Sequence, residues 1–208
     1  MQRILIVDDH PLYREGLMGA LRTQLADVSL MGADSAEDGL RILEESPDAD
    51  LVLLDLRLPG MDGFEALSVY GQRFPMVPRV LVSGSDEALH VRRAFDLGAS
   101  GFFPKSLSVA EFSAAILQVL AGGVYVPGSA TARDVSLKDS LTVRQIEVLH
   151  LLGEGYTNKE IARSLDITER TAKAHVRAIF VALGAENRTQ AVMNAQRLGQ
   201  LPTRRQRV

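Results

Sequence analysis

The stretch Leu51-Val-Leu-Leu-Asp-Leu-Arg-Leu-Pro-Gly-Met-Asp-Gly63 decides how the first half of the chain folds. Its first four residues are apolar and show no polar alternation, which is typical of a strand buried on both faces of a parallel sheet. Asp55 follows where such a strand would end, and Pro59 and Gly60 then mark a loop. The stretch therefore predicts a central strand with a carboxylate at its carboxyl end.

The same alternation extends in both directions through residues 1–121. Short apolar runs lie at 4–7, 28–32, 51–54, 80–82 and 101–103, and helical patterns lie at 12–24, 35–45, 63–72, 86–97 and 108–121. Pro11 suits the first position of a helix, and Ser35 suits an N-cap with Asp38 three residues later. Five strand–helix pairs predict a flavodoxin-like, doubly wound, five-stranded parallel sheet, with its functional site at the carboxyl ends of the strands.

The charge of the 208 residues is divided unevenly between the two parts of the chain. Residues 1–124 carry 10 Lys and Arg against 18 Asp and Glu (net −8), and residues 125–208 carry 13 against 8 (net +5). An acidic part suits a bound cation, and a basic part suits nucleic acid, although a solvated basic surface is the simpler alternative. With 46% hydrophobic and 24% charged residues, the composition is that of a folded protein of one or two domains.

The sequence contains no cysteine. This excludes disulfides, thiolate nucleophiles and Cys-ligated metal centres, and it favours a cytoplasmic location. Residues 1–9 lack the pattern of a signal peptide, and no window of 18 uncharged apolar residues follows. We expect neither export nor a membrane partner.

The periodic pattern breaks between residues 122 and 139, where glycine and proline recur, and we predict a linker there. Short helical patterns follow. Thr142 with Gln145, and Thr157 with Glu160, have the spacing of capping boxes. We therefore predict a first domain over residues 1–121, a small all-α four-helix domain over 140–201 and a basic tail over 202–208.

Polar residues follow four of the predicted strands: Asp8 and Asp9, Asp55, Ser83, and Lys105. In a parallel sheet these residues converge on one edge. Three carboxylates repel one another unless a hard cation such as Mg²⁺ neutralises them, and an Asp carboxylate can attack a phosphoryl donor while Mg²⁺ and a Lys ammonium neutralise the phosphoryl oxygens. A single Asp after a strand is usually a turn or cap residue, but the five residues together favour a phosphoryl-transfer site.

Residues 1 to about 121 resemble a bacterial response-regulator receiver domain, on the strength of Asp8-Asp9, the segment 55–63, Ser83-Gly84 and the segment Gly98-Ala-Ser-Gly-Phe-Phe-Pro-Lys105. The resemblance implies a phosphoacceptor at Asp55, a direct Mg²⁺ ligand at Asp9 with Asp8 acting through water, a further ligand at the Arg57 carbonyl, phosphoryl-binding residues at Ser83 and Lys105, and an aromatic switch at Phe102. Two departures are Ser106, where many receivers have Pro, and Phe102, which lacks the hydroxyl of the common Tyr. The Arg57 side chain is equally well read as a solvated loop residue.

Two short predicted helices, 158–165 and 169–183, are joined by Asp166 and Ile167, which is the spacing of a helix-turn-helix. Apolar residues of the second helix should face a core: Ala172, Val176, Ile179, Phe180 and Leu183. Its outer side then carries Arg170, Lys173, Ala174 and Arg177, which suit a major groove. Residues near helix starts are placed to contact phosphates: Asn158, Lys159, Thr168 and Thr171. For Lys173 or Arg177 considered alone, a solvated position on the helix surface is the simpler interpretation.

The segments 141–149 (LTVRQIEVL), 155–162 (GYTNKEIA) and 168–176 (TERTAKAHV) are similar to the LuxR/NarL-type DNA-binding domain. The resemblance implies base contacts by Lys173, Ala174 and Arg177, and a last helix that pairs protomers through Ala191, Val192, Ala195 and Leu198. Ala182 stands where the family usually has Lys, which weakens the positive field.

Together these features predict a transcription regulator of the NarL/LuxR (FixJ) family. Its expected partners are promoter DNA, a sensor histidine kinase and, on activation, a second copy of the chain, with RNA polymerase as a further candidate. One alternative is a haloacid-dehalogenase-like phosphatase, but such enzymes usually place a second Asp two residues after the first, where this chain has Arg57. A second alternative is a receiver that dimerises without phosphorylation. The presence of the acidic pair, Asp55 and Lys105 argues against it. We expect no enzymatic activity beyond self-phosphorylation and slow self-dephosphorylation at Asp55.

Overall fold

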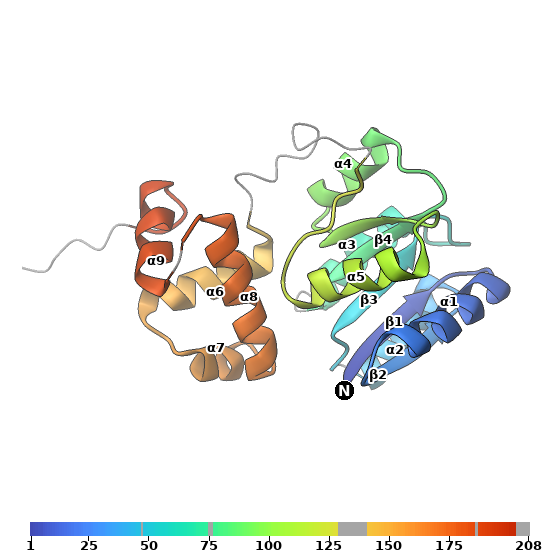
Figure 1. The fold of residues 1–208 in the computed structure, drawn as a ribbon, viewed down its shortest axis with the longest axis horizontal. Helices are drawn as coiled ribbons and strands as arrows, with labels where there is room; N and C mark the ends of the chain where they lie inside the picture. The colour runs from blue at the N-terminus through green and yellow to red at the C-terminus, as the bar shows by residue number, and fades with distance from the viewer. Residues whose placement is uncertain (47, 75–76, 129–140, 186, 203–208) are drawn as a thin grey trace, which may run out of the picture. The chain divides into compact units, whose positions relative to one another are not determined.

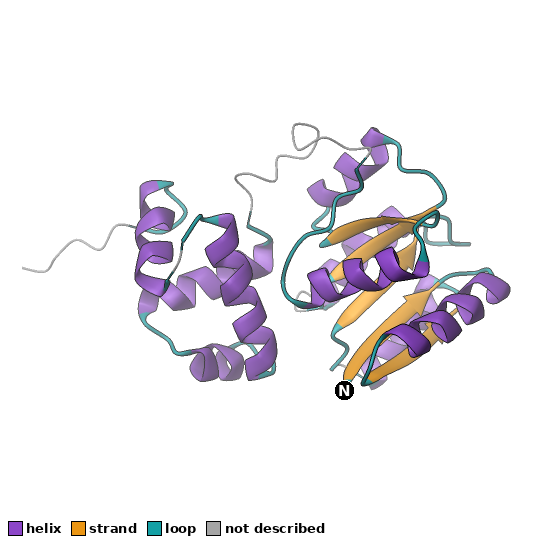
Figure 2. Cartoon of the chain, in the orientation of Figure 1, coloured by secondary structure: helices purple, strands orange, loops and turns teal. Residues whose placement is uncertain are grey.

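The computed structural model describes residues 1–46, 48–74, 77–128, 141–185 and 187–202, and their helices and strands are drawn in Figures 1 and 2. The chain divides into two compact units, Met1–Ser136 and Leu137–Val208. Within the described ranges, no helix has both the length and the apolar composition needed to span a bilayer.

The described part of the N-terminal unit is built on a five-stranded parallel sheet. Its strands are β1 (Gln2–Val7), β2 (Val28–Ala33), β3 (Leu51–Asp55), β4 (Arg79–Ser83) and β5 (Gly101–Pro104). The strand order is β2-β1-β3-β4-β5, and all neighbouring pairs are parallel. The predicted flavodoxin-like order is therefore confirmed, and β3, which is buried along its whole length, lies at the centre.

Helices cover both faces of this sheet (Figure 1). On one face lie α1 (Pro11–Gln24) and α5 (Val109–Leu120), and on the other lie α2 (Ala36–Glu45), α3 (Gly63–Arg73) and α4 (Ala88–Asp96). The core under α1 and α5 is fully apolar and includes Ile4, Leu21, Leu51, Leu53, Val80, Phe103 and Ile116. Burial of these side chains fixes the strands, so the residues at the strand ends are held by a rigid framework.

The segment after α5 returns to the sheet. Tyr125 forms a parallel bridge with Gly101, and its carbonyl accepts a hydrogen bond of 3.1 Å from the Phe102 amide. Its ring meets the Phe103 ring edge-on, with 5.0 Å between centroids. Residue 125, within the predicted 122–139 linker, therefore adds to the N-terminal sheet, because it bridges to the outer edge of β5. Residues 129–139 lie outside the described residues, and the four domain boundaries remain predictions.

The described part of the C-terminal unit consists of α6 (Val143–Glu154), α7 (Asn158–Ser164), α8 (Glu169–Ala182) and α9 (Arg188–Arg197). The capping boxes expected at Thr142 and Thr157 are present. Asp166 turns the chain between α7 and α8 with φ 50°, a left-handed conformation that Asp tolerates better than most residues. The helices enclose an apolar core that includes Leu149, Leu152, Ile161, Ala172, Ile179 and Ala195.

Candidate functional site

The polar residues predicted to converge do meet at one edge of the sheet. Lys105 Nζ lies 2.7 Å from Asp8 Oδ2 and 2.9 Å from Asp55 Oδ2, although the three residues are far apart in the chain. Asp8 follows β1, Asp55 ends β3 and Lys105 follows β5. Both carboxylates are buried, so Lys105 supplies a cation to two acids that water screens poorly.

Local backbone contacts hold these side chains in place. A Cβ on Gly63 would clash with the Asp55 carbonyl oxygen, so only glycine lets α3 begin directly against the end of β3. The Lys105 amide donates to the Ser83 carbonyl at 2.7 Å, and the buried Ser83 hydroxyl accepts from the Ser85 amide at 3.2 Å. Ser83 and Lys105 therefore lie side by side at the ends of β4 and β5.

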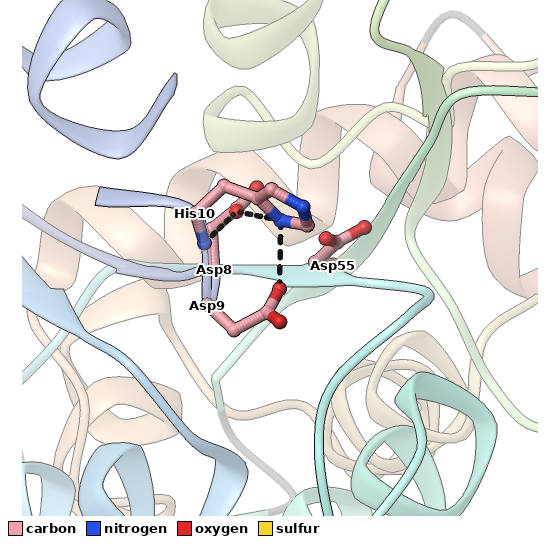
Figure 3. A group of neighbouring side chains, drawn as sticks. All are labelled: Asp8, Asp9, His10 and Asp55. Atoms are coloured by element: carbon pink, nitrogen blue, oxygen red, sulfur yellow. Dashed lines mark hydrogen bonds and ion pairs between the residues drawn. The ribbon is translucent and has the colours of Figure 1, made fainter. Parts of the chain in front are cut away.

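The acidic pair after β1 is arranged around His10, as Figure 3 shows. The His10 amide donates to Asp8 Oδ1 at 2.9 Å, and His10 Nδ1 lies 2.8 Å from Asp9 Oδ1 and 3.4 Å from Asp8 Oδ1. Asp9 Oδ1 is screened from solvent and accepts no well-aligned hydrogen bond from any described residue. His10 Nδ1 is therefore the polar neighbour of this oxygen.

The surroundings shift the pKa values of Asp55 and Lys105, which form an ion pair. Burial raises the pKa of Asp55, and hydrogen bonding to Lys105 only partly offsets this effect. Burial alone would lower the pKa of Lys105, but its hydrogen bonds to Asp8 and Asp55 outweigh burial and raise it. Lys105 therefore stays protonated while it faces these acids.

A hard divalent cation fits this donor set. Asp8, Asp9, His10 and Asp55 each offer a ligand atom, and these atoms all lie within 4.8 Å of one another. Carboxylate oxygens are the ligands that Mg²⁺ prefers, and Asp9 Oδ1, which is buried and accepts no well-aligned hydrogen bond from a described residue, can serve as one of them. Asp55 accepts a hydrogen bond from the Arg57 backbone amide, and the Arg57 side chain lines a hollow with Ser85 and Arg93.

Tyr13 is a member of this site that sequence reasoning missed. Lys105 Nζ lies 4.3 Å from the centroid of its ring, within the range of a cation–π contact. The available signal was its position in the first turn of a helix that starts directly after the Asp8-Asp9 pair. Phe102, the predicted switch, is fully buried in the sheet core.

The second group of predicted residues lies on α8. Its predicted core residues are buried or partly buried, so its opposite side carries exposed Lys173 and Arg177 with partly exposed Ala174 between them. Lys173 Nζ lies 2.7 Å from Glu169 Oε1 one turn earlier. The side chain of Arg170 lies outside the part of the chain that the structure describes.

The residues predicted to contact phosphates lie at the two helix starts. Thr168 caps α8 by accepting from the Thr171 amide at 3.1 Å, and the two hydroxyls are 2.8 Å apart. Lys159 is exposed in the first turn of α7, and Asn158 beside it is partly exposed. The first backbone amides of a helix have no partner within the helix, and a helix start therefore suits an anionic ligand.

A buried polar pair lies on two neighbouring helices, with Arg144 on α6 and His175 on α8. His175 is only 6% exposed, and neither of its ring nitrogens has a hydrogen-bond partner among the described residues. Burial, reinforced by the nearby charge of Arg144, lowers the pKa of His175 to about 4. Arg144 is itself buried and reaches Glu147 with one nitrogen at 2.7 Å.

The residues predicted to pair protomers differ in exposure. Ala191 and Ala195 are 0% exposed in the single chain because they pack into the core of their own unit. Val192 is partly buried, and Leu198 is 54% exposed. The exposed side of α9 carries Met193 instead, at 62%.

Comparison with known proteins matches both units. Residues 4–117 match the response regulator receiver domain, and residues 139–195 match the bacterial regulatory proteins of the luxR family. The chain belongs to the LuxR-family response regulators. These regulators combine a receiver with a LuxR-type helix-turn-helix and bind DNA.

Two relatives of this response regulator match it over nearly their whole length, and one solved structure matches part of it. The glycerol metabolism activator of Pseudomonas putida is 37% identical, with 94% of this chain and 95% of the relative covered. The nitrate/nitrite response regulator protein NarL of Escherichia coli K12 is 34% identical, with 91% and 93% covered. A crystal structure of a LuxR family DNA-binding response regulator from Silicibacter pomeroyi is 32% identical with a TM-score of 0.56, covering 62% of this chain and 99% of that one.

Proposed function

We propose that this response regulator is switched by phosphorylation of Asp55, with a sensor histidine kinase as donor, and that the switch alters dimerisation and promoter binding by the C-terminal unit. The observation that carries the proposal is the placement of the Lys105 ammonium between the buried carboxylates of Asp8 and Asp55. A nucleophilic carboxylate, a fixed cation and further acids for a metal form the minimum set for phosphoryl transfer.

The proposed step forms one bond and breaks another. An Asp55 carboxylate oxygen attacks the phosphorus of a phosphohistidine, the phosphorus–nitrogen bond breaks, and the imidazole leaves and takes up a proton. Lys105 and the Ser83 hydroxyl stabilise the phosphoryl oxygens during transfer. Hydrolysis of the acyl phosphate, by attack of water on phosphorus, returns the Asp55 carboxylate and inorganic phosphate. We propose no other covalent chemistry.

Asp9 and Asp55 would hold Mg²⁺ directly, with the Arg57 carbonyl as a further ligand and Asp8 acting through water. When bound, Mg²⁺ supplies positive charge that offsets the acids and the phosphoryl oxygens. The clustering of the three carboxylates supports this assignment.

The switch itself is assigned to Ser83 and Phe102. A phosphoryl group on Asp55 draws the Ser83 hydroxyl toward it, and Phe102 moves into the vacated space, which changes the surface around α4 and β5. Two protomers bound to adjacent half-sites then combine their contacts through effective concentration. We place the dimer contact of the C-terminal unit on the exposed side of α9, at Val192, Met193 and Leu198.

The C-terminal unit would read DNA with α8. Lys173, Ala174 and Arg177 are placed for base contacts in the major groove, Arg170 for the same surface, and the residues at the starts of α7 and α8 for phosphates. A cytoplasmic location follows from the proposed function, because the promoter DNA of a bacterium lies in the cytoplasm. RNA polymerase is proposed as a partner only at the promoter.

The test is Asp55→Asn with a small acyl phosphate as donor and MgCl₂. The amide keeps the shape of the side chain but cannot form a stable acyl phosphate, so intact-mass measurement should show phosphorylation of the wild type and none of the variant. Asp62→Asn, at the exposed N-cap of α3, is the matched control and should be phosphorylated normally. Equal phosphate incorporation in Asp55→Asn would contradict the assignment.

A second measurement tests the proposed metal site separately from phosphorylation. Titration with MgCl₂ alone should show weaker binding to Asp9→Ala than to the wild type, because the change removes one ligand and one negative charge. Equal affinity would remove Asp9 from the metal site.

A further inference from the structure

Tyr13 is brought to the phosphoryl-transfer site by the start of α1. The helix begins at Pro11, directly after the Asp8-Asp9-His10 turn, so its first turn stands beside the carboxyl end of β1. Leu12, its neighbour, is 90% exposed, whereas Tyr13 is partly buried. The first turn therefore directs one aromatic ring toward the site and one aliphatic side chain into solvent.

The ring of Tyr13 contacts the ammonium group of Lys105, which also pairs with Asp8 and Asp55. A Lys ammonium has three N–H donors. Two carboxylate oxygens accept from Lys105 Nζ, at 2.7 and 2.9 Å, and the Tyr13 ring centroid lies 4.3 Å from the same nitrogen. The electron-rich face of the ring attracts the ammonium, so three groups from two separate parts of the chain fix its position.

The electrostatic surroundings keep the phenol neutral. Burial raises the pKa of Tyr13; the charge of Lys105 opposes this effect, and those of Asp8 and Asp55 add to it. The hydroxyl therefore remains protonated through the neutral range, and the ring acts on Lys105 through its face rather than as a phenolate.

We propose that Tyr13 is a positioning residue for phosphoryl transfer, whose ring holds the Lys105 ammonium toward Asp55 and limits the access of water beside it. The inference rests on the proposed phosphorylation of Asp55. It gives the ring two effects. A fixed ammonium accelerates phosphorylation because no reorientation is needed in the transition state, and a screened acyl phosphate is hydrolysed more slowly.

The test compares Tyr13→Leu with Tyr13→Phe. Leu keeps an apolar side chain but removes the ring, whereas Phe keeps the ring and removes only the hydroxyl. With acetyl phosphate and MgCl₂, we expect Tyr13→Leu to lower the saturating phosphorylation rate about fivefold and to shorten the acyl-phosphate lifetime by a similar factor, the size of a half-buried cation–π contact. Tyr13→Phe should restore both to within about twofold of the wild type.

An NMR measurement on the unphosphorylated chain tests the contact separately. The ring should shift the Lys105 ε-methylene protons upfield in the wild type and in Tyr13→Phe, and the shift should vanish in Tyr13→Leu. Leu12→Ala, one residue away on the same helical turn, is the matched control and should change neither the shift nor the rates. Circular dichroism of each variant verifies that the fold is kept.

The outcomes separate this inference from the proposed function. If the wild type takes up no phosphoryl group at Asp55, the proposed function fails, and the methylene shift still decides whether the ring contacts Lys105. If the wild type is phosphorylated and Tyr13→Leu matches it in rate and lifetime, the positioning role is overturned. Loss of activity in Tyr13→Phe as large as in Tyr13→Leu would overturn it as well, because the hydroxyl would then be the active group.

Discussion

The receiver site and the recognition helix hold their cations in opposite ways. The Lys105 side chain is 20% exposed and is held by two buried carboxylates from other strands. The Lys173 side chain is 61% exposed, and its partner Glu169 lies on its own helix. A phosphoryl-transfer site needs a cation that is already oriented before reaction, whereas a DNA-reading surface loses its water only when DNA binds. Burial and the origin of the partner thus distinguish Lys105, which we propose to bind the phosphoryl group, from Lys173, which we propose to contact DNA.

Removing the buried cation is expected to have the largest effect. Lys105→Met leaves Asp8 and Asp55 facing each other, and breaking such a pair costs about 3–5 kcal/mol of stability when it is fully buried. Because Lys105 is partly exposed, we expect about 3 kcal/mol in the presence of a chelator. Saturating MgCl₂ should recover most of this loss, since a divalent cation supplies the missing charge. Hydrogen exchange of the β3 amides measures both values.

Lys159→Met, at an exposed position of α7, is the control for that experiment and should change neither value. An equal loss for Lys105→Met with and without Mg²⁺ would show that the carboxylates and the cation do not form one electrostatic unit.

The buried His175 gives the C-terminal unit a pH dependence. Its pKa is about 4 in the folded chain, against about 6.5 in the unfolded chain, so the unfolded chain binds the proton first as the pH falls. Stability is complete above about pH 6.5 and declines by about 3 kcal/mol in total as the pH falls to about 4. Hydrogen exchange of the α8 amides at a series of pH values should reveal this slope, and His175→Leu should flatten it.

His150 is exposed on α6, so His150→Leu should keep the wild-type slope. A slope that survives in His175→Leu would mean that other groups, such as Arg144 with Glu147, account for the pH dependence.

Truncating the exposed cations of α8 should have a smaller effect that depends on DNA sequence. If Lys173 or Arg177 contacts a guanine, substitution by Ala costs about 1–3 kcal/mol on the preferred site and relaxes the preference at one base position. If either only attracts phosphates, binding weakens equally on all sequences and the salt slope falls by about one unit. Competition across a randomised operator at two salt concentrations distinguishes these results.

Lys159→Ala serves as the phosphate-type control in that competition. Unchanged base preference in both Lys173→Ala and Arg177→Ala would mean that a different side of α8 enters the groove.

The smallest expected effect concerns the ion pair within α8. Exposed pairs one turn apart contribute little to stability, so Glu169→Gln should leave the fold unchanged. It frees Lys173 and removes a negative charge from the surface, and we expect DNA to bind about twofold more tightly at low salt. Glu154→Gln, exposed on α6, should have a weaker effect. Filter binding at low and high salt measures the difference, and weaker binding by Glu169→Gln would indicate that Glu169 orients Lys173 for DNA.

Periodicity and capping chemistry were enough to predict most of the fold. The alternation of apolar runs and helical patterns predicted the sheet order, and the sheet order then placed Asp8, Asp55 and Lys105 together, because parallel strands end at the same edge. The boxes at Thr142 and Thr157 were predictable for the same kind of reason, since each depends only on residues three apart.

Features that depend on tertiary neighbours could not be predicted in this way. Ala191 and Ala195 form a small apolar stripe that suits a core and a dimer interface equally well, and only the packing of α6 and α8 decides between them. The contact of Tyr13 with Lys105 joins residues 92 positions apart, which no local spacing records. The burial of Arg144 likewise runs against the ordinary preference of arginine for solvent.

The return of Tyr125 to β5 bears on where the receiver can be cut. An outer strand with free amides and carbonyls is a template for pairing with another chain, and Tyr125 occupies part of that template on β5 through hydrogen bonds to Ser100 and Phe102. A fragment that stops at residue 121 would bare the strand and remove an aromatic neighbour of Phe103. The shortest receiver fragment that resists edge-to-edge aggregation therefore extends past the last helix, through Tyr125.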